Sequence, residues 1–201
     1  MTFSKPYATR EALEQTIAHH AWLNEHAGSL RLPAIRTVRA DGIDFASIEG
    51  RHARFTDAPA VATVLGRAHA AAWKGDLHRA LLAASPATPV AFYKDTNLRN
   101  VLITADGPVM VDLDDLTLAP FGYDLAKLLV TLAMTYGPLP PATFTTSLAC
   151  YNQPLIDAGL PPVPIGRFLG HAELHHLLTL PYLGKSGYRH PWPTVRPDRR
   201  T

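Results

Sequence analysis

The chain has 201 residues, of which 47% are hydrophobic, and this is enough for one domain with a core or for two small lobes around a cleft. Charged residues make up 18% and the formal net charge is only +2, so we expect no nucleic-acid partner. The single cysteine, Cys150, excludes an intrachain disulfide. With no apolar signal core and no apolar run of membrane-spanning length, we expect a cytoplasmic protein without a membrane partner, and the oligomeric state stays open.

The first part of the chain predicts a small antiparallel sheet and one helix. Thr9 is suited to cap the helix, because its hydroxyl can accept a hydrogen bond from the first turn, and Gly28 is suited to end it. A hairpin follows, with its turn at 40–42. The expected order is a strand at 2–7, a helix at 9–28, and strands at 34–38 and 43–48.

The remainder predicts helices around one further hairpin. Pro86 and Pro89 end a long Ala- and Leu-rich helix, and the turn at 105–107 joins the hairpin strands. Helices are expected at 58–82, 122–136, 142–158 and 164–180, strands at 90–93, 101–104 and 109–113, and an irregular tail after 181. Helices segregated from short antiparallel strands indicate an α+β fold. We place a boundary at Glu49-Gly50, between a small lobe (1–50) and a helical lobe (51–201).

The densest polar pattern lies between Asp95 and Asp112. Asp95 and Asn100 flank a short polar loop, and the hairpin returns Asp112 to the neighbourhood of Asn100. Two carboxylates and a carboxamide are therefore expected close together. Oxygen ligands of this type suit Mg²⁺, and a carboxylate beside such a site can deprotonate an attacking hydroxyl.

This pattern resembles a known family. The Asp-x-x-x-x-Asn spacing, followed by a hairpin and an apolar-Asp-apolar strand end, resembles the catalytic loop and metal-binding strand of the protein-kinase-like fold. The runs 112–115 and 122–126 extend the resemblance to the aminoglycoside phosphotransferase and choline kinase-like family. Tyr93 stands where that family usually has a histidine.

The resemblance implies a two-lobe kinase-like fold with a truncated small lobe, and ATP and Mg²⁺ as cofactors. Asp95 would be the catalytic base, and Asn100 and Asp112 would hold Mg²⁺ on the ATP phosphates. Lys5 would contact the phosphates from the first strand. The backbone between the lobes would contact the adenine ring at Ser47, Ile48 and Glu49.

Two departures from the family pattern stand upstream. Thr16 occupies the helix position where a glutamate would pair with Lys5, and Glu14 lies two residues away, about 200° round the helix. The sequence also begins four residues before Lys5, without the family's strand–glycine-rich turn–strand. This predicts a trimmed chain, an enzyme with an open lid, or an inactive relative.

The expected activity is transfer of the γ-phosphate of ATP to a hydroxyl of a small molecule, such as an aminoglycoside-like compound, an amino alcohol or a related metabolite. The alternatives are a degenerate kinase fold that serves as a nucleotide-binding or interaction module without catalysis, and a structural helical domain. Asp114 and Glu173 are the candidate acceptor-binding carboxylates. Asp124 is expected near a helix N-terminus. Arg99 flanks the base and is expected as a solvated loop charge, with steering of phosphates as the alternative. For Tyr182, Tyr188 and Trp192 we expect a place over the core, with a pocket lining as the alternative.

Overall fold

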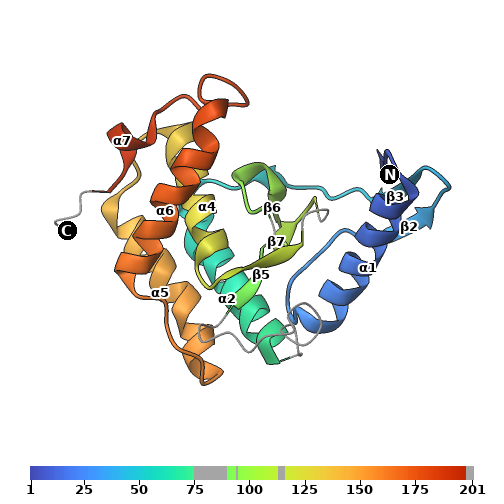
Figure 1. The fold of residues 1–201 in the computed structure, drawn as a ribbon, viewed down its shortest axis with the longest axis horizontal. Coiled ribbons are helices and arrows are strands. Elements are labelled where there is room, and N and C mark those ends of the chain that lie inside the picture. Colours follow the sequence, from blue (N-terminus) through green and yellow to red (C-terminus); the bar gives the residue numbers. More distant parts are fainter. Residues whose placement is uncertain (75–89, 94, 113–115, 198–201) are drawn as a thin grey trace.

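The computed structural model describes residues 1–74, 90–93, 95–112 and 116–197. Its strands are β1 (Thr2–Pro6), β2 (Ile35–Val38), β3 (Gly42–Ala46), β4 (Arg51–His52), β5 (Val90–Tyr93), β6 (Val101–Thr104), β7 (Gly107–Met110) and β8 (Thr117–Pro120). Its helices are α1 (Arg10–His26), α2 (Ala58–Lys74), α4 (Tyr123–Tyr136), α5 (Pro141–Asp157), α6 (Ile165–Thr179) and α7 (Trp192–Val195). Figure 1 shows β1–β3 and α1 at one end of the molecule, α4–α7 at the other, and β6 and β7 between them.

The N-terminal part is an antiparallel sheet in the order β1-β3-β2, with α1 beside it. In β1, Lys5 lies opposite Ile43 of β3. The Thr9 hydroxyl accepts a hydrogen bond from the Ala12 amide at 3.2 Å, as expected of the N-cap, and Gly28 takes a left-handed conformation after the helix. A small core of Leu13, Ile43 and Phe45 joins α1 to the sheet.

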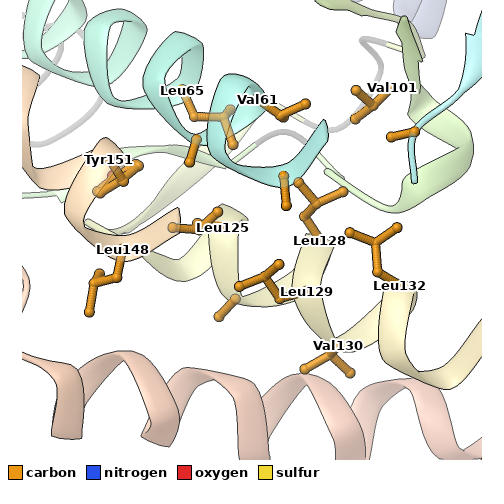
Figure 2. Packing of buried hydrophobic residues seen from close by; sticks show 14 of the residues in the cluster. Val61, Leu65, Val101, Leu125, Leu128, Leu129, Val130, Leu132, Leu148 and Tyr151 are labelled. Atoms are coloured by element: carbon orange, nitrogen blue, oxygen red, sulfur yellow. The ribbon is translucent and has the colours of Figure 1, made fainter. Parts of the chain in front are cut away.

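A second and larger core lies among the helices. Figure 2 shows side chains of α2, α4 and α5 meeting there, among them Leu65, Leu125 and Leu148. Helices α2 and α5 pack so closely that a Cβ on Gly66 would collide with the carbonyl oxygen of Tyr151. The C-terminal end of α1 also reaches this core through Leu23, so α1 contacts both hydrophobic clusters.

The central strands differ from those expected. Strand β4 was not predicted; it pairs with β6, which pairs in turn with β7. Strand β8 was not predicted either, and it pairs with β5. Strand β4 has only two residues, and β8 is the short run Thr-Leu-Ala-Pro, which ends in proline. Neither strand is long enough to show the alternation that predicts a strand. Strand β7 ends at Met110, so Asp112 lies beyond the strand and not at its end.

The C-terminal segment is not wholly irregular, because it contains α7, where Trp192 is buried in the large core. The observed elements are otherwise those of the predicted α+β fold, although the predicted helix over 58–82 is described only to Lys74. Within the described residues, no helix has the length and hydropathy needed to cross a membrane. The boundary between 1–50 and 51–201 stays a prediction.

Candidate active site

The polar loop between β5 and β6 is held by hydrogen bonds from its own side chains and from α4. The Asn97 side chain accepts from the Arg99 amide at 2.9 Å, and a 3₁₀ turn spans Leu98–Asn100. The Leu98 amide donates to the Thr131 hydroxyl of α4 at 3.2 Å. These contacts fix the main chain on either side of the loop, so its polar side chains have defined positions.

Asp95 begins this loop, and its carboxylate is partly exposed. It accepts hydrogen bonds from the Asn97 amide group at 3.2 Å and from the ammonium group of Lys127 in α4. The Asn100 side-chain amide donates to the Asp95 carbonyl oxygen at 2.8 Å. The two ends of the predicted Asp-x-x-x-x-Asn pattern therefore meet across the loop.

Asp112 is placed near the same loop by the hairpin. The Val111 amide donates to the Asn100 carbonyl oxygen at 2.9 Å, which continues the β6–β7 pairing. Asp112 itself has a φ of 64°, a left-handed conformation that aspartate tolerates better than most side chains. Its carboxylate is paired with the ammonium group of Lys5, which joins the N-terminal sheet to the hairpin.

Asn100 and Asp112 fit the requirements of Mg²⁺, which takes a few oxygen ligands and completes its shell with phosphates and water. The Asn100 side chain has its amide nitrogen engaged by Asp95, so its oxygen is the group left to face a metal. No cluster of three or more His, Cys, Asp or Glu suited to a metal occurs among the described residues. This argues against a dedicated metal cage in that part of the chain.

A buried polar network lies behind the loop. The Thr96 hydroxyl donates to the Asp124 carboxylate, and His69 Nε2 lies 3.6 Å from the other oxygen of Asp124. The Tyr151 hydroxyl, which accepts from the Gly122 amide at 3.0 Å, lies 2.6 Å from His69 Nδ1. Burial raises the pKa of Tyr151, so its hydroxyl keeps its proton.

A cleft of about 680 Å³ separates the N-terminal sheet from the β6–β7 hairpin. Lys5 and Asp112 lie in it, together with Ser47 and Ile48 of the predicted adenine-contacting segment. Glu49, the third member of that segment, is not among the lining residues. The Ser47 amide donates to the Met1 carbonyl oxygen at 3.2 Å. The sheet side of the cleft is largely apolar, with lining residues Phe3, Tyr7, Pro33, Phe45 and Ala46.

A second cavity, of about 250 Å³, opens on the other side of the loop. Asp95, Asn97 and Arg99 line it from the loop, and Lys127 lines it from α4. The remaining lining residues come from α6 and the segment after it: His175, Leu178, Thr179, Tyr182, Ser186 and Tyr188. Tyr188 lines the cavity but is also buried in the large core, and Trp192 is in that core too, both as expected. Tyr182 is exposed and lines this cavity, so its expected place over the core is corrected. The reason is the turn closed by the Gly184 amide on the Tyr188 carbonyl oxygen at 2.8 Å, which folds this segment back toward the loop.

His175 is buried under this cavity and is neutral. Its Nε2 donates to the Tyr123 carbonyl oxygen at 2.9 Å. Burial, and then the nearby charge of Lys127, lower the pKa of His175 to about 3. The positive charges at this cavity therefore come from Lys127 and Arg99 and not from His175.

Glu173 is placed differently from the expectation, and the upstream residues Glu14 and Thr16 can be compared with theirs. Glu173 is on α6, as expected, but it does not line the cavity and accepts from Arg196 at 3.3 Å instead. Glu14 accepts from Arg10 on the exposed side of α1, which agrees with its unfavourable helical phase. Thr16 is buried and donates to the Ala12 carbonyl oxygen, and Asp114 lies outside the described residues.

Sequence reasoning missed Lys127. Asp124, Lys127 and Thr131 have the spacing i, i+3, i+7 and therefore share one face of α4. They contact the loop residues Thr96, Asp95 and Leu98 respectively. Polar residues at this spacing in an otherwise apolar helix were the available signal. Asp124 is one residue inside the helix, whose N-cap is Gly122, and it anchors the loop.

The loop, the hairpin behind it and the cleft between a small sheet and a helical part define a protein-kinase-like fold. Residues 4–154 match the phosphotransferase enzyme family, and since this is most of the chain, the protein belongs to that family. A comparison with curated proteins gave no match.

Solved structures of three phosphotransferases share the fold at low sequence identity. Macrolide 2'-phosphotransferase from Brachybacterium faecium is 15% identical, with a TM-score of 0.55 and coverage of 98% of this chain and 84% of that one. Choline kinase from Cryptosporidium parvum is 11% identical, with a TM-score of 0.54 and coverage of 87% and 69%. An aminoglycoside phosphotransferase from Streptomyces rimosus, in complex with ADP and streptomycin, is 17% identical, with a TM-score of 0.52 and coverage of 86% and 84%.

Proposed function

We propose that this protein is a kinase that transfers the γ-phosphate of ATP, with Mg²⁺, to a hydroxyl of a small molecule. The observation that carries the proposal is the position of the Asp95–Asn100 loop between two cavities. Lys5 and Asp112 line the larger cavity, and Asp95 lines the smaller one. A nucleotide in the first and an acceptor in the second would meet at this loop.

In the proposed reaction, Asp95 takes the proton of the acceptor hydroxyl as the acceptor oxygen bonds to the γ-phosphorus. The bond between that phosphorus and the β,γ-bridging oxygen breaks, and ADP leaves with the electron pair. Asp95 suits this role because Lys127 and Asn97 orient its carboxylate toward the smaller cavity. The acceptor then leaves as a phosphate ester.

Asn100 and Asp112 would hold the metal, and Lys5 would contact the nucleotide phosphates. When bound, Mg²⁺ would neutralise phosphate charge and orient the transferred group. The pairing of Lys5 with Asp112 places both groups at one point of the larger cleft. A phosphate there would be contacted by Lys5, and Asp112 would be available as a ligand.

The acceptor is proposed to be an aminoglycoside-like compound, an amino alcohol or a related hydroxylated metabolite. Among the described residues that line the smaller cavity, Asp95 is the only carboxylate, and Lys127 neutralises it. Glu173, predicted to attract a cationic acceptor, lies elsewhere. Neutral and acidic polyols therefore belong in the acceptor panel beside amino sugars and choline-like alcohols.

Nucleotide binding without turnover is the second candidate function. The position of Glu14 favours this second function. Glu14 pairs with Arg10 on the exposed side of α1, so it does not form the lysine–glutamate pair expected from the family resemblance. This second function is opposed by the joint presence of Asp95, Asn100 and Asp112 around one loop. A protein that only binds nucleotide does not need Asp95.

Consumption of Mg·ATP separates the two candidates when it is measured with the acceptor panel on the natural protein and on Asp95→Ala. Turnover lost in Asp95→Ala, with an unchanged rise of the melting temperature in Mg·ATP, supports the kinase. A rise in melting temperature without turnover on any acceptor supports the binding protein. If the natural protein shows neither turnover nor a rise in melting temperature, both candidate functions are rejected. Asp157→Ala, an exposed carboxylate on α5, is the matched control and keeps full turnover.

A further inference from the structure

Arg99 has a position shared by no other described residue that lines the two cavities. It lines both the 680 Å³ cleft and the 250 Å³ cavity. Its neighbour Asn100 lies toward the hairpin, and Asp95 lies on the side of the smaller cavity. The Arg99 side chain therefore borders both the proposed nucleotide site and the proposed acceptor site.

The main chain that carries Arg99 is fixed. Its amide donates to the Asn97 side chain at 2.9 Å, and the residues on both sides of it, Leu98 and Asn100, are buried. The Leu98 amide is tied to Thr131 of α4. The side chain is thus presented from a fixed turn, and Arg99 itself is exposed, as expected.

The guanidinium group of Arg99 packs against the C-terminal segment at Gly187 and Tyr188. Its central carbon lies 5.6 Å from the centre of the Tyr188 ring, a distance at which a cation is attracted to an aromatic face. A Cβ on Gly187 would lie 3.2 Å from a guanidinium nitrogen, so the backbone approaches Arg99 closely there. Gly187 has a φ of +85°, which suits this turn and disfavours larger side chains. A ring and a close backbone together orient the guanidinium.

Arg99 differs from the two lysines near the loop in its ion pairing. Lys5 is paired with Asp112, and Lys127 is paired with Asp95. In the portions of the chain that the structure covers, no carboxylate forms an ion pair with Arg99. Its planar group has five N–H donors suited to phosphate oxygens.

We propose that Arg99 binds the phosphoryl group while it is transferred from nucleotide to acceptor. This inference rests on the proposed kinase function and adds a catalytic residue to it. In the transfer, charge is distributed over the three equatorial oxygens of the phosphoryl group between its two partners. A cation at the junction of the cavities stabilises that arrangement more than it stabilises bound ATP or ADP, and so lowers the barrier.

The test is a binding measurement that needs no knowledge of the acceptor. Mg·ADP alone and Mg·ADP with aluminium fluoride, which imitates the phosphoryl group in flight, are titrated calorimetrically into the natural protein, Arg99→Ala and Arg99→Lys. We expect Arg99→Ala to bind Mg·ADP within about twofold of the natural protein, because its binding groups are unchanged. Binding of the fluoride complex weakens by on the order of 10²-fold, and Arg99→Lys recovers part of it.

The matched control is Arg67→Ala, an exposed arginine on α2 beside a different cavity, which binds both ligands normally. If Arg99→Ala binds the fluoride complex as tightly as the natural protein does, the inference is overturned. An equal loss for Mg·ADP also overturns it, because Arg99 would then act on the nucleotide in general. Failure of the natural protein to bind Mg·ADP rejects the proposed function itself, and the inference with it.

Discussion

The ammonium group of Lys127 forms an ion pair with the carboxylate of Asp95, and this pair connects helix α4 to the candidate catalytic loop. The two side chains are 18% and 30% exposed, so the pair is largely shielded from water. Lys127 shares its helix face with Asp124 and Thr131, which also contact the loop. Helix α4 therefore positions the loop through three separate polar contacts.

Lys127→Met is predicted to lower both stability and turnover. Without the lysine, a partly buried carboxylate loses its partner, and we expect a loss of about 1 kcal/mol in the free energy of unfolding. Turnover falls by on the order of tenfold because Asp95 is no longer oriented. Urea unfolding and steady-state kinetics measure the two effects. Lys127→Arg should keep most of the stability and most of the turnover. The control Lys185→Met, at an exposed position, should change neither stability nor turnover. Natural-like kinetics in Lys127→Met would contradict a positioning role.

Asp124→Ala is predicted to be more damaging to the fold. Asp124 is 1% exposed and accepts from Thr96, so its removal leaves a buried hydroxyl without its acceptor and releases the loop from α4. We expect a loss of about 3 kcal/mol in the free energy of unfolding, measured by urea denaturation. Asp106→Ala, in an exposed pair with Arg31, is the control and costs less than about 1 kcal/mol. Equal effects of the two substitutions would exclude the anchoring role of Asp124.

His175 predicts how stability depends on pH. Its pKa is about 3 in the folded protein against an ordinary value of 6.5, so between these values the unfolded chain binds more protons than the folded one. The contribution of neutral His175 to the free energy of unfolding is complete above pH 6.5 and is lost as the pH falls toward 3. At pH 5 the loss is about 2 kcal/mol. His175→Gln keeps a donor for the Tyr123 carbonyl and removes the titration.

The measurement is urea unfolding of the natural protein and of His175→Gln at pH 7.5 and pH 5. The free energy of unfolding of the natural protein should fall more steeply than that of the variant. Parallel losses would show that other groups dominate the acid sensitivity of the fold.

Two glycines offer a matched test of helix packing. A Cβ on Gly66 would collide with the Tyr151 carbonyl oxygen, so Gly66→Ala must push α2 away from α5, and we expect a loss of about 3 kcal/mol. A Cβ on Gly170 of α6 would meet no atom within 4 Å, so Gly170→Ala should stabilise by about 0.5–1 kcal/mol through helix propensity. Thermal unfolding measures both. A destabilised Gly170→Ala together with a tolerated Gly66→Ala would refute this account of the packing.

Much of the site was predictable because its signals are local. The Asp95–Asn100 spacing and the hairpin leading to Asp112 lie within one short stretch. The structure brings Asp95 and Asn100 together across the loop, and the main chain next to Asp112 pairs with Asn100. The N-cap at Thr9 and the end of α1 at Gly28 are likewise local. These features depend on hydrogen bonds and backbone preferences that neighbouring residues determine.

The contacts that were missed join residues distant in the sequence. Lys127 reaches a loop about thirty positions earlier, and Tyr188 meets Arg99 across an even longer separation. Glu173 was placed on the correct helix, but its orientation toward Arg196 depends on how α6 packs against the C-terminal segment. The helical period of α4 could have indicated that Lys127 lies on a polar face, but no period names the partners in these pairs, because they follow from tertiary packing.

The link between β3 and β4, residues Ser47–Gly50, is tied at both ends. The Ser47 amide donates to the carbonyl oxygen of Met1, which precedes β1, and the Ala53 amide, just past β4, donates to the Val101 carbonyl oxygen of the β6–β7 hairpin at 3.1 Å. A Cβ on Gly50 would lie 2.9 Å from the Ile103 carbonyl oxygen, so a larger side chain at this position would push the link away from β6. Because Ser47 and Ile48 of this link line the large cleft, we expect an added methyl group at Gly50 to change the shape of that cleft without touching the candidate catalytic residues.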